Sequence, residues 1–294
     1  MKIAYLDCFS GISGDMCLGA LVGAGVDLDV LREHLARLPV HGYEIRREKI
    51  RRGGLAAENI VVEVFEPDQP ERHLGDIEGI IGSSDLPEAV KAKSIAVFRC
   101  LAEAEARVHG IGREEVHFHE VGAVDAVVDV VGTVTGFALL GVEKVYASPL
   151  PLGHGFIRCR HGLVPSPAPA TLEILKNVPV YGTAVEAELV TPTGAALAAT
   201  LAGAFVPFPS MVVTAIGYGS GKTDLEHPNL LRLVVGEACG DELPPAHAED
   251  SHTHRDAHDH GEGHSHPHPP SHGHTHTHGR RSVPEHPPAG GRES

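Results

Sequence analysis

The chain has 294 residues and a formal net charge of −15, with 42% hydrophobic and 4% aromatic residues and no tryptophan. This composition provides a sizeable core, and the length suits one large domain or two modest ones. The negative charge and the scarcity of rings argue against a nucleic-acid partner, because a phosphate backbone would be repelled and bases would lack stacking surfaces. No apolar run approaches the roughly 20 residues of a membrane helix, and the early Asp7 argues against a signal peptide.

Cysteine usage points to a reducing compartment. The five cysteines are an odd number and include no C-x-x-C pair. Neither a zinc knuckle nor a disulfide framework is therefore expected, and the pattern predicts a cytoplasmic protein.

Composition divides the chain near residue 240 into two parts. Residues 1–240 predict one globular α/β or α+β domain, a layered mixed sheet with packed helices. Residues 241–294 carry 13 of the 22 histidines and little to bury, so we expect a disordered tail. The expected strands are 1–9, 43–50, 57–66, 142–147, 153–159, 210–219 and 229–237, and the expected helices are 15–25, 27–38, 87–109, 124–141, 167–176 and 191–203.

The stretch "HFHEVGAVDAVVD", residues 117–129, is the first candidate site. On an extended segment His117 and His119 point to the same side, and Asp125 and Asp129 share one face of the following helix. Together with Glu120 they predict a site for zinc, nickel or iron(II), or an acid and base pair. The alternative is structural, with acids complementing the helix dipole and histidines capping backbone groups.

The stretch "DCFSGISGDM", residues 7–16, is the second candidate. A strand, a Ser/Gly loop and a helix start predict a seat for an anion on backbone N–H groups. Asp7 and Asp15 instead favour a nearby cation, such as one bridging to phosphate. An ordinary strand–helix turn is the alternative. The proposed binding residues of this loop are Ser10, Gly11, Ser13 and Gly14.

Three further stretches carry weaker signals. Thr191, Thr193 and Gly194 in "ELVTPTGAA" predict a helix cap or a second anion seat. The stretch "GYGSGKTD", residues 217–224, lacks the glycine spacing of a P-loop, although Lys222 could reach a ligand. The basic groups of residues 150–171 suit an anionic substrate or a solvated strand.

The histidines of the tail predict loose, multi-site binding of nickel or zinc that fades below about pH 6.5. A cloning tag is the alternative, which the irregular spacing of the histidines disfavours. The central ligands in this prediction are His264, His266, His268, His272, His274, His276 and His278.

Five of these motifs occur in the order found in a known family. "DCFSGISGDM", "HFHEVGAVDAVVDVVG", "LPLGHGFIRCRHGLVPSPAPAT", "ELVTPTGAA" and "GYGSGKTD…NLLR" make residues 1 to about 238 resemble the LarC family of nickel-insertion proteins. The histidine-rich segment is similar as well.

The resemblance implies a nickel chelatase that acts on pyridinium-3,5-bisthiocarboxylic acid mononucleotide. CTP, with Mg²⁺ or Mn²⁺, would be consumed to CMP and pyrophosphate, and the (SCS)Ni pincer nucleotide would serve lactate racemase-type enzymes. Family members continue into a second, CTP-associated domain, so a separate C-terminal half chain is an expected partner. A homo-oligomer is also compatible.

The candidate residues can be matched to the roles that this implied activity requires. The Ser10–Asp15 loop would seat the phosphate, His117, His119 and Glu120 would hold nickel, and Asp125 and Asp129 would bind or support it. A carboxylate or imidazole of this cluster would accept the proton that leaves the ring as the Ni–C bond forms, with Glu120, Asp125 and Asp129 as the catalytic candidates. Two rivals stay open: a non-catalytic nickel or zinc storage and delivery chaperone, and a metal-dependent phosphohydrolase.

Overall fold

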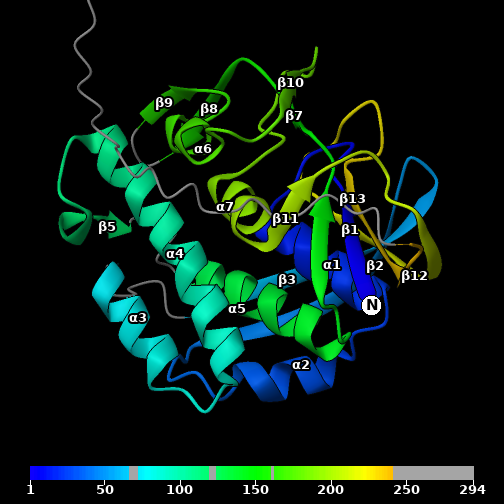
Figure 1. Cartoon of the computed structure of the whole chain (residues 1–294). Coiled ribbons are helices and arrows are strands. Elements are labelled where there is room, and N and C mark those ends of the chain that lie inside the picture. The colour runs from blue at the N-terminus through cyan, green and yellow to red at the C-terminus, as the bar shows by residue number, and fades with distance from the viewer. Residues whose placement is uncertain (66–71, 119–123, 160–161, 241–294) are drawn as a thin grey trace, which may run out of the picture. The chain divides into compact units, whose positions relative to one another are not determined.

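The computed structural model describes residues 1–65, 72–118, 124–159 and 162–240 (Figure 1). These residues form a mixed α/β fold built on a large mixed sheet, as predicted. The expected disorder of residues 241–294 lies outside the described residues and stays a prediction, as does the domain boundary at residue 240.

Seven strands form the main sheet, in the order β11-β6-β1-β13-β12-β3-β2. Strand β1 is parallel to β6 and antiparallel to β13, and its residues 3–6 are buried because neighbours cover both edges and both faces. Strands β2 and β3 form the antiparallel pair predicted around Gly53 and Gly54. The strand bounds are β1 Lys2–Asp7, β2 Tyr43–Arg52, β3 Leu55–Val64, β6 Lys144–Ala147, β11 Ala202–Phe205, β12 Met211–Ser220 and β13 Leu230–Ala238.

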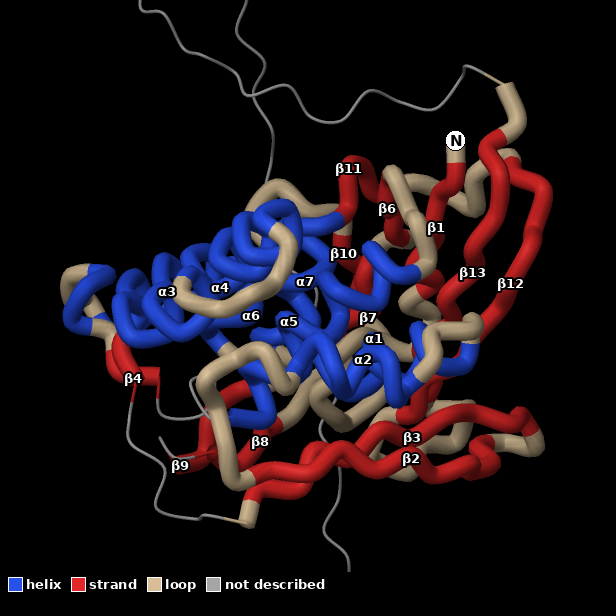
Figure 2. The backbone as a smooth tube through the Cα atoms, turned by 90° about the horizontal axis from the view of Figure 1, so that it is seen from below, coloured by secondary structure: helices blue, strands red, loops and turns tan. Residues whose placement is uncertain are grey.

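The helices gather on one side of this sheet, which curls around them (Figure 2). Helix α1 lies between the sheet and helix α5, so apolar or small residues surround it. Helix α4 runs beside α5 and packs also on α3, α6 and α7. The bounds are α1 Gly14–Gly23, α2 Leu28–Leu35, α3 Leu74–Gly82, α4 Glu88–His109, α5 Val124–Leu139, α6 Pro169–Ile174 and α7 Pro192–Leu201.

Glycines allow α1 to lie directly on strand β12. A Cβ atom at Gly219 would stand 1.8 Å from the Met16 carbonyl oxygen, and one at Gly217 would stand 1.9 Å from the Ala20 carbonyl oxygen. Both positions therefore need glycine for close backbone packing. This packing, and not a phosphate-binding loop, accounts for the first two glycines of "GYGSGKTD".

The structure adds helix α3 and several short elements to the predicted pattern. The strand expected at 153–159 begins only at Phe156, because Gly155 has a φ of +93°. Helix α7 ends at Leu201, and the chain continues as β11. The other short elements are β4 Arg72–His73 paired with β5 His117–Phe118, β7 Leu150–Leu152 with β10 Val180–Gly182, β8 Phe156–Cys159 with β9 Gly162–Pro165, and a 3-10 turn at Arg113–Glu115.

No helix within the described ranges combines the length and the apolar character that a bilayer crossing requires.

Candidate functional site

Two of the predicted loops lie against each other. The backbone N–H of Ile12 donates to the Leu189 carbonyl at 2.9 Å, and the N–H of Thr191 donates to the Ile12 carbonyl at 3.2 Å. Gly194 fits closely here, since its Cβ would stand 2.1 Å from the Ile12 carbonyl oxygen. The loop before α1 and the start of α7 therefore form one unit, although about 180 residues separate them.

A cluster of three carboxylates and one lysine lies at the start of α1. Lys222 Nζ is 3.3 Å from Asp15 Oδ2. Asp125 and Asp129 of α5 belong to the same electrostatic group, because together with Asp15 they raise the pKa of Lys222. Asp129 packs on Gly14, where a Cβ would stand 2.4 Å from Asp129 Oδ2. The predicted pair of aspartates thus contacts the predicted loop at Gly14, a position that only glycine can occupy.

Asp129 is the most perturbed acid of this cluster. Its Oδ1 atom is buried and has no hydrogen-bond partner among the described residues. Burial raises the pKa of Asp129 well above its usual range, the charges of Asp15 and Asp125 raise it further, and Lys222 opposes the shift. A buried carboxylate with a raised affinity for a proton, beside an exposed acid, Asp125, is suited to proton transfer.

Side chains of other elements hold the backbone of the Lys222 loop, whereas the Lys222 side chain is 81% exposed beside Asp15. Arg52 Nη2 donates to the carbonyls of Gly221 and Lys222 at 3.2 and 3.3 Å. Asn229 Nδ2 donates to the Thr223 carbonyl at 2.8 Å. The loop therefore presents a long, movable cation beside fixed carboxylates.

The other residues predicted in the first loop have partners elsewhere in the fold or within the loop itself. Ser10 is fully buried, with its Oγ 2.9 Å from His227 Nε2. Gly11 has a φ of +103° and abuts the Leu189 carbonyl. The Ser13 hydroxyl bonds to Asp15, and Asp7 accepts from Arg232 Nε at 2.8 Å. Asp7 is therefore paired within the sheet, whereas Asp15 lies in the carboxylate cluster.

Asp15 also affects the predicted anion seat at α1. Its Oδ1 atom accepts from the Met16 N–H at 2.9 Å, so a carboxylate already occupies the start of this helix. At the start of α7, Thr191 Oγ1 accepts from the Gly194 N–H at 3.1 Å, which is the predicted cap. Thr191 and Thr193 are half-buried there. Of the two predicted anion seats, the one at the start of α7 is therefore the one without an acid in the first turn of its helix.

His117 lies in a separate cleft of about 290 Å³. Its ring contacts that of His73, with centroids 3.9 Å apart, and its strand β5 pairs with β4. The cleft is lined by Glu105, Val108, His109, His117, Phe118, Ile157, Arg158, Cys159, Val164, Ala168, Pro169, Ala170, Glu188 and Pro192. Residues from three predicted stretches, at 117–129, 150–171 and 188–196, therefore meet here.

His119, Glu120 and the tail histidines from His264 to His278 lie outside the described residues, and their assignment stays a prediction. Within the described ranges, no three His, Cys, Asp or Glu side chains are grouped so as to hold a metal ion. The structure therefore brings Asp125 and Asp129 to Asp15 and Lys222, and it places His117 in a different group.

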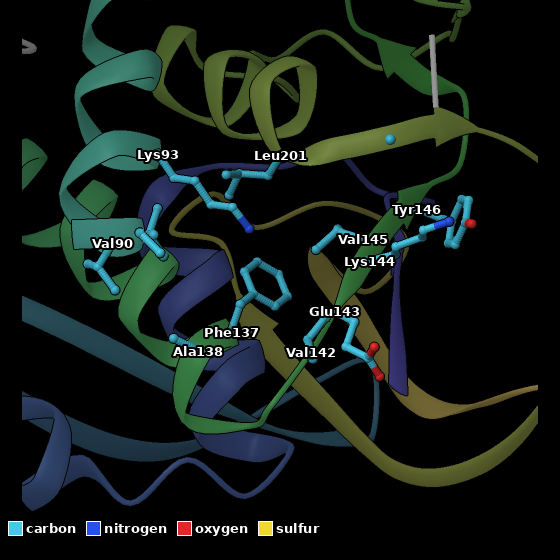
Figure 3. Close-up of a pocket in the computed structure, with 13 residues that line it drawn as sticks. Val90, Lys93, Phe137, Ala138, Val142, Glu143, Lys144, Val145, Tyr146 and Leu201 are labelled. Atoms are coloured by element: carbon cyan, nitrogen blue, oxygen red, sulfur yellow. The ribbon is translucent and has the colours of Figure 1, made fainter. Parts of the chain in front are cut away.

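A second cavity, of about 330 Å³, lies between α4, α5 and β6 and is mainly apolar. Phe137, Leu201 and Lys93 point into it (Figure 3). None of the predicted site residues lines this cavity. It is therefore not part of the candidate site.

Comparison with known proteins identifies the family. The family described as nickel insertion protein matches residues 4–261. The chain belongs to this family. The match includes the loop before α1, the carboxylate cluster and the cleft around His117.

Relatives in three bacteria carry related names. Proteins named pyridinium-3,5-bisthiocarboxylic acid mononucleotide nickel insertion protein are 54% identical in Desulfitobacterium hafniense and 47% identical in Geobacillus kaustophilus. A putative nickel insertion protein of Geotalea daltonii is 52% identical. These alignments cover 81–82% of this chain but only 60–61% of the relatives, so the chain spans about 60% of their length. No solved structure matches the chain.

The sequence alone does not identify three residues of these sites. His227 lies in the turn "DLEHPN", which carries no metal or catalytic pattern. Cys159 stands alone in sequence, and Glu188 precedes a cap motif that draws attention to its threonines. Only the tertiary contacts bring His227 to Ser10, and Cys159 and Glu188 to the cleft of His117.

Proposed function

We propose that this chain takes part in inserting nickel into pyridinium-3,5-bisthiocarboxylic acid mononucleotide, as a chelatase of the lyase class. Membership of the nickel insertion family and the names of its relatives support this proposal. The carboxylate cluster at the start of α1 is the structural observation that carries it, because the reaction needs both a cation-binding surface and a proton acceptor.

The charges of the acceptor molecule fit this cluster. Its pyridinium ring is positive, and the acidic side chains of Asp15 and Asp125, next to Asp129, form a negative surface for it. Its phosphate and thiocarboxylates are negative, and the exposed ammonium of Lys222 can reach them. Opposite charges placed at fixed positions orient a ligand as well as bind it.

The chemical step is a replacement of a proton by a metal. The ring C–H bond breaks, its electron pair forms the Ni–C bond, and the two thiocarboxylate sulfurs complete the pincer around Ni²⁺. The released proton goes to a carboxylate, and nickel keeps its oxidation state. Asp129, whose pKa is raised by burial and by its acidic neighbours, is the group best suited to keep this proton. Asp125 is exposed and can pass the proton to water.

The phosphate is assigned to the start of α7. Asp15 repels an anion at α1, whereas Thr191 and Thr193 offer hydroxyl groups at a helix start without an acid in its first turn, where Thr191 also caps the Gly194 N–H. In this proposal Ser10, Gly11, Ser13 and Gly14 shape the loop that holds α7 and the carboxylates together.

The remaining assignments concern partners. Nickel is cargo that His117 receives, with His119 and Glu120 as further ligands and the tail histidines raising its local concentration. CTP with Mg²⁺ or Mn²⁺ supplies the driving force, and we assign its site to the part of the relatives to which this chain does not align; a chain that carries this part is a proposed partner. We expect a cytoplasmic protein, as a monomer or homo-oligomer, whose product is used by lactate racemase-type enzymes.

Titration with Ni²⁺ and the mononucleotide, with and without CTP and Mg²⁺, tests the proposal. The expected result is mononucleotide binding followed by a product whose mass includes one nickel and lacks one proton per ring. Nickel binding without mononucleotide binding would instead identify a storage and delivery chaperone. Release of inorganic phosphate from simple esters would identify a phosphohydrolase.

A further inference from the structure

The cleft around His117 is lined by groups with different chemistry. Apolar side chains, including Phe118, Ile157 and Val164, form one part of the wall. His117, Cys159 and Glu188 add an imidazole, a thiol and a carboxylate to the same cleft. A concave site that combines an apolar wall with a few converging polar groups is typical of ligand binding.

The five cysteines differ in their access to a metal ion. Cys8 and Cys17 are buried in the core, and burial raises the pKa of both thiols. Burial also raises the pKa of Cys100. A thiol must lose its proton to bind a metal, so these three positions are unsuitable ligands. Cys239 is exposed at the end of β13, and Cys159 alone lines the cleft together with a histidine.

We propose that Cys159 and His117 form a two-ligand transfer site for Ni²⁺ in this cleft. The inference rests on the proposed function and adds to it a thiolate ligand. Imidazole nitrogen and thiolate sulfur are both suitable donors for a late transition metal. Binding removes the proton of the Cys159 thiol, which goes to solvent, and leaves nickel as Ni²⁺.

A site with only two protein ligands leaves coordination positions open for the transfer of the ion. A site that surrounds the ion with protein groups retains it, whereas open coordination positions admit an incoming ligand. No three described His, Cys, Asp or Glu side chains form a closed metal site. The two thiocarboxylate sulfurs of the acceptor can therefore fill the remaining positions and draw nickel away.

The position of the cleft is consistent with transfer to the carboxylate cluster. Glu188 and Pro192 line the cleft, and the same segment bonds through Leu189 and Thr191 to the loop before α1. Val124 at the start of α5 follows Phe118 of the cleft by six positions, a span of at most about 22 Å. The contact between the His73 and His117 rings restricts how His117 can turn.

Nickel binding by the full chain, without the mononucleotide, tests this site separately from the insertion reaction. The thiolate-to-nickel charge-transfer absorption reports cysteine ligands and not nickel bound to the tail, because residues 241–294 contain many histidines but no cysteine. We expect the band in the wild type and in Cys239→Ser, its loss in Cys159→Ser, and at least a ~10-fold weaker nickel affinity of the band in His117→Ala.

Unchanged far-ultraviolet circular dichroism would show that each variant is folded. A wild-type chain without the band, or a band that survives in Cys159→Ser, would overturn the two-ligand site. Loss of the band in Cys239→Ser would show that Cys239, and not Cys159, supplies the thiolate, and it would overturn the two-ligand site as well. Failure of the proposed function would instead appear as absence of mononucleotide binding in a chain that still shows the band.

Discussion

Gly219→Ala tests how α1, and with it the carboxylate cluster, is positioned. The new methyl group would stand 1.8 Å from the Met16 carbonyl oxygen and 2.6 Å from the Ala20 nitrogen. Ordinary contact begins near 3.4 Å, so helix and strand must separate by about 1.6 Å. Both obstacles are backbone atoms of one helix, which cannot move aside as a side chain can. We therefore expect the upper end of the overpacking range, a loss of about 3 kcal/mol in the free energy of unfolding.

For a domain of this size, a loss of about 3 kcal/mol lowers Tm by roughly 6 to 12 °C. Thermal unfolding followed by circular dichroism measures it. Gly79→Ala is the matched control: it lies in helix α3 with no atom within 4 Å of the new Cβ, so alanine should stabilise the protein by about 0.5 to 1 kcal/mol. A Gly219→Ala variant that unfolds within about 2 °C of the wild type would refute the close-packing argument.

Three further predictions concern electrostatics and nickel supply. Because the pKa of Asp129 is raised in the folded state, its contribution to stability is fully present below its unfolded pKa and is lost as pH rises through the folded pKa. The free energy of unfolding of Asp129→Asn should therefore gain about 1.4 kcal/mol over that of the wild type per pH unit within that window. A Tm difference between the two proteins that does not change between pH 4 and 9 would contradict this. Lys222→Met removes the charge that lowers the pKa of Asp129, so the decline of its Tm with pH should continue to a higher pH than in the wild type, and Tm–pH curves that level off at the same pH would count against the cluster. Deleting residues 241–294 should leave the insertion rate unchanged at abundant nickel and slow it at scarce nickel, as measured by product mass at the two concentrations; equal slowing at both would show that the tail does more than concentrate nickel.

Much of the fold could be predicted because local patterns agree with it. The continuous apolar run of β1 marks a strand buried on both faces. The long periodic segment 87–109 becomes α4 at residues 88–109, and Asp27 caps α2 as predicted, accepting from the Asp29 N–H at 2.8 Å. These elements depend on residues close in sequence, which is what periodicity records.

The candidate site was less predictable because it depends on contacts between distant segments. The sequence indicated Asp125 and Asp129 as a pair, but their partners Asp15 and Lys222 come from two other stretches. The glycines at 217 and 219 resembled a ligand-binding loop, although their small size serves the packing of α1. Cys159 has no nearby sequence partner, so only the tertiary structure brings it to His117.

Single-turnover nickel insertion by a His117→Ala/His119→Ala double variant is the most direct test of the central claim. The wild type and the variant would be saturated with the mononucleotide, supplied with CTP and Mg²⁺ and the separate C-terminal half, and sampled for the nickel-containing product by mass. The account predicts equal binding of the mononucleotide and no nickel transfer by the variant. Transfer at the wild-type rate would contradict it.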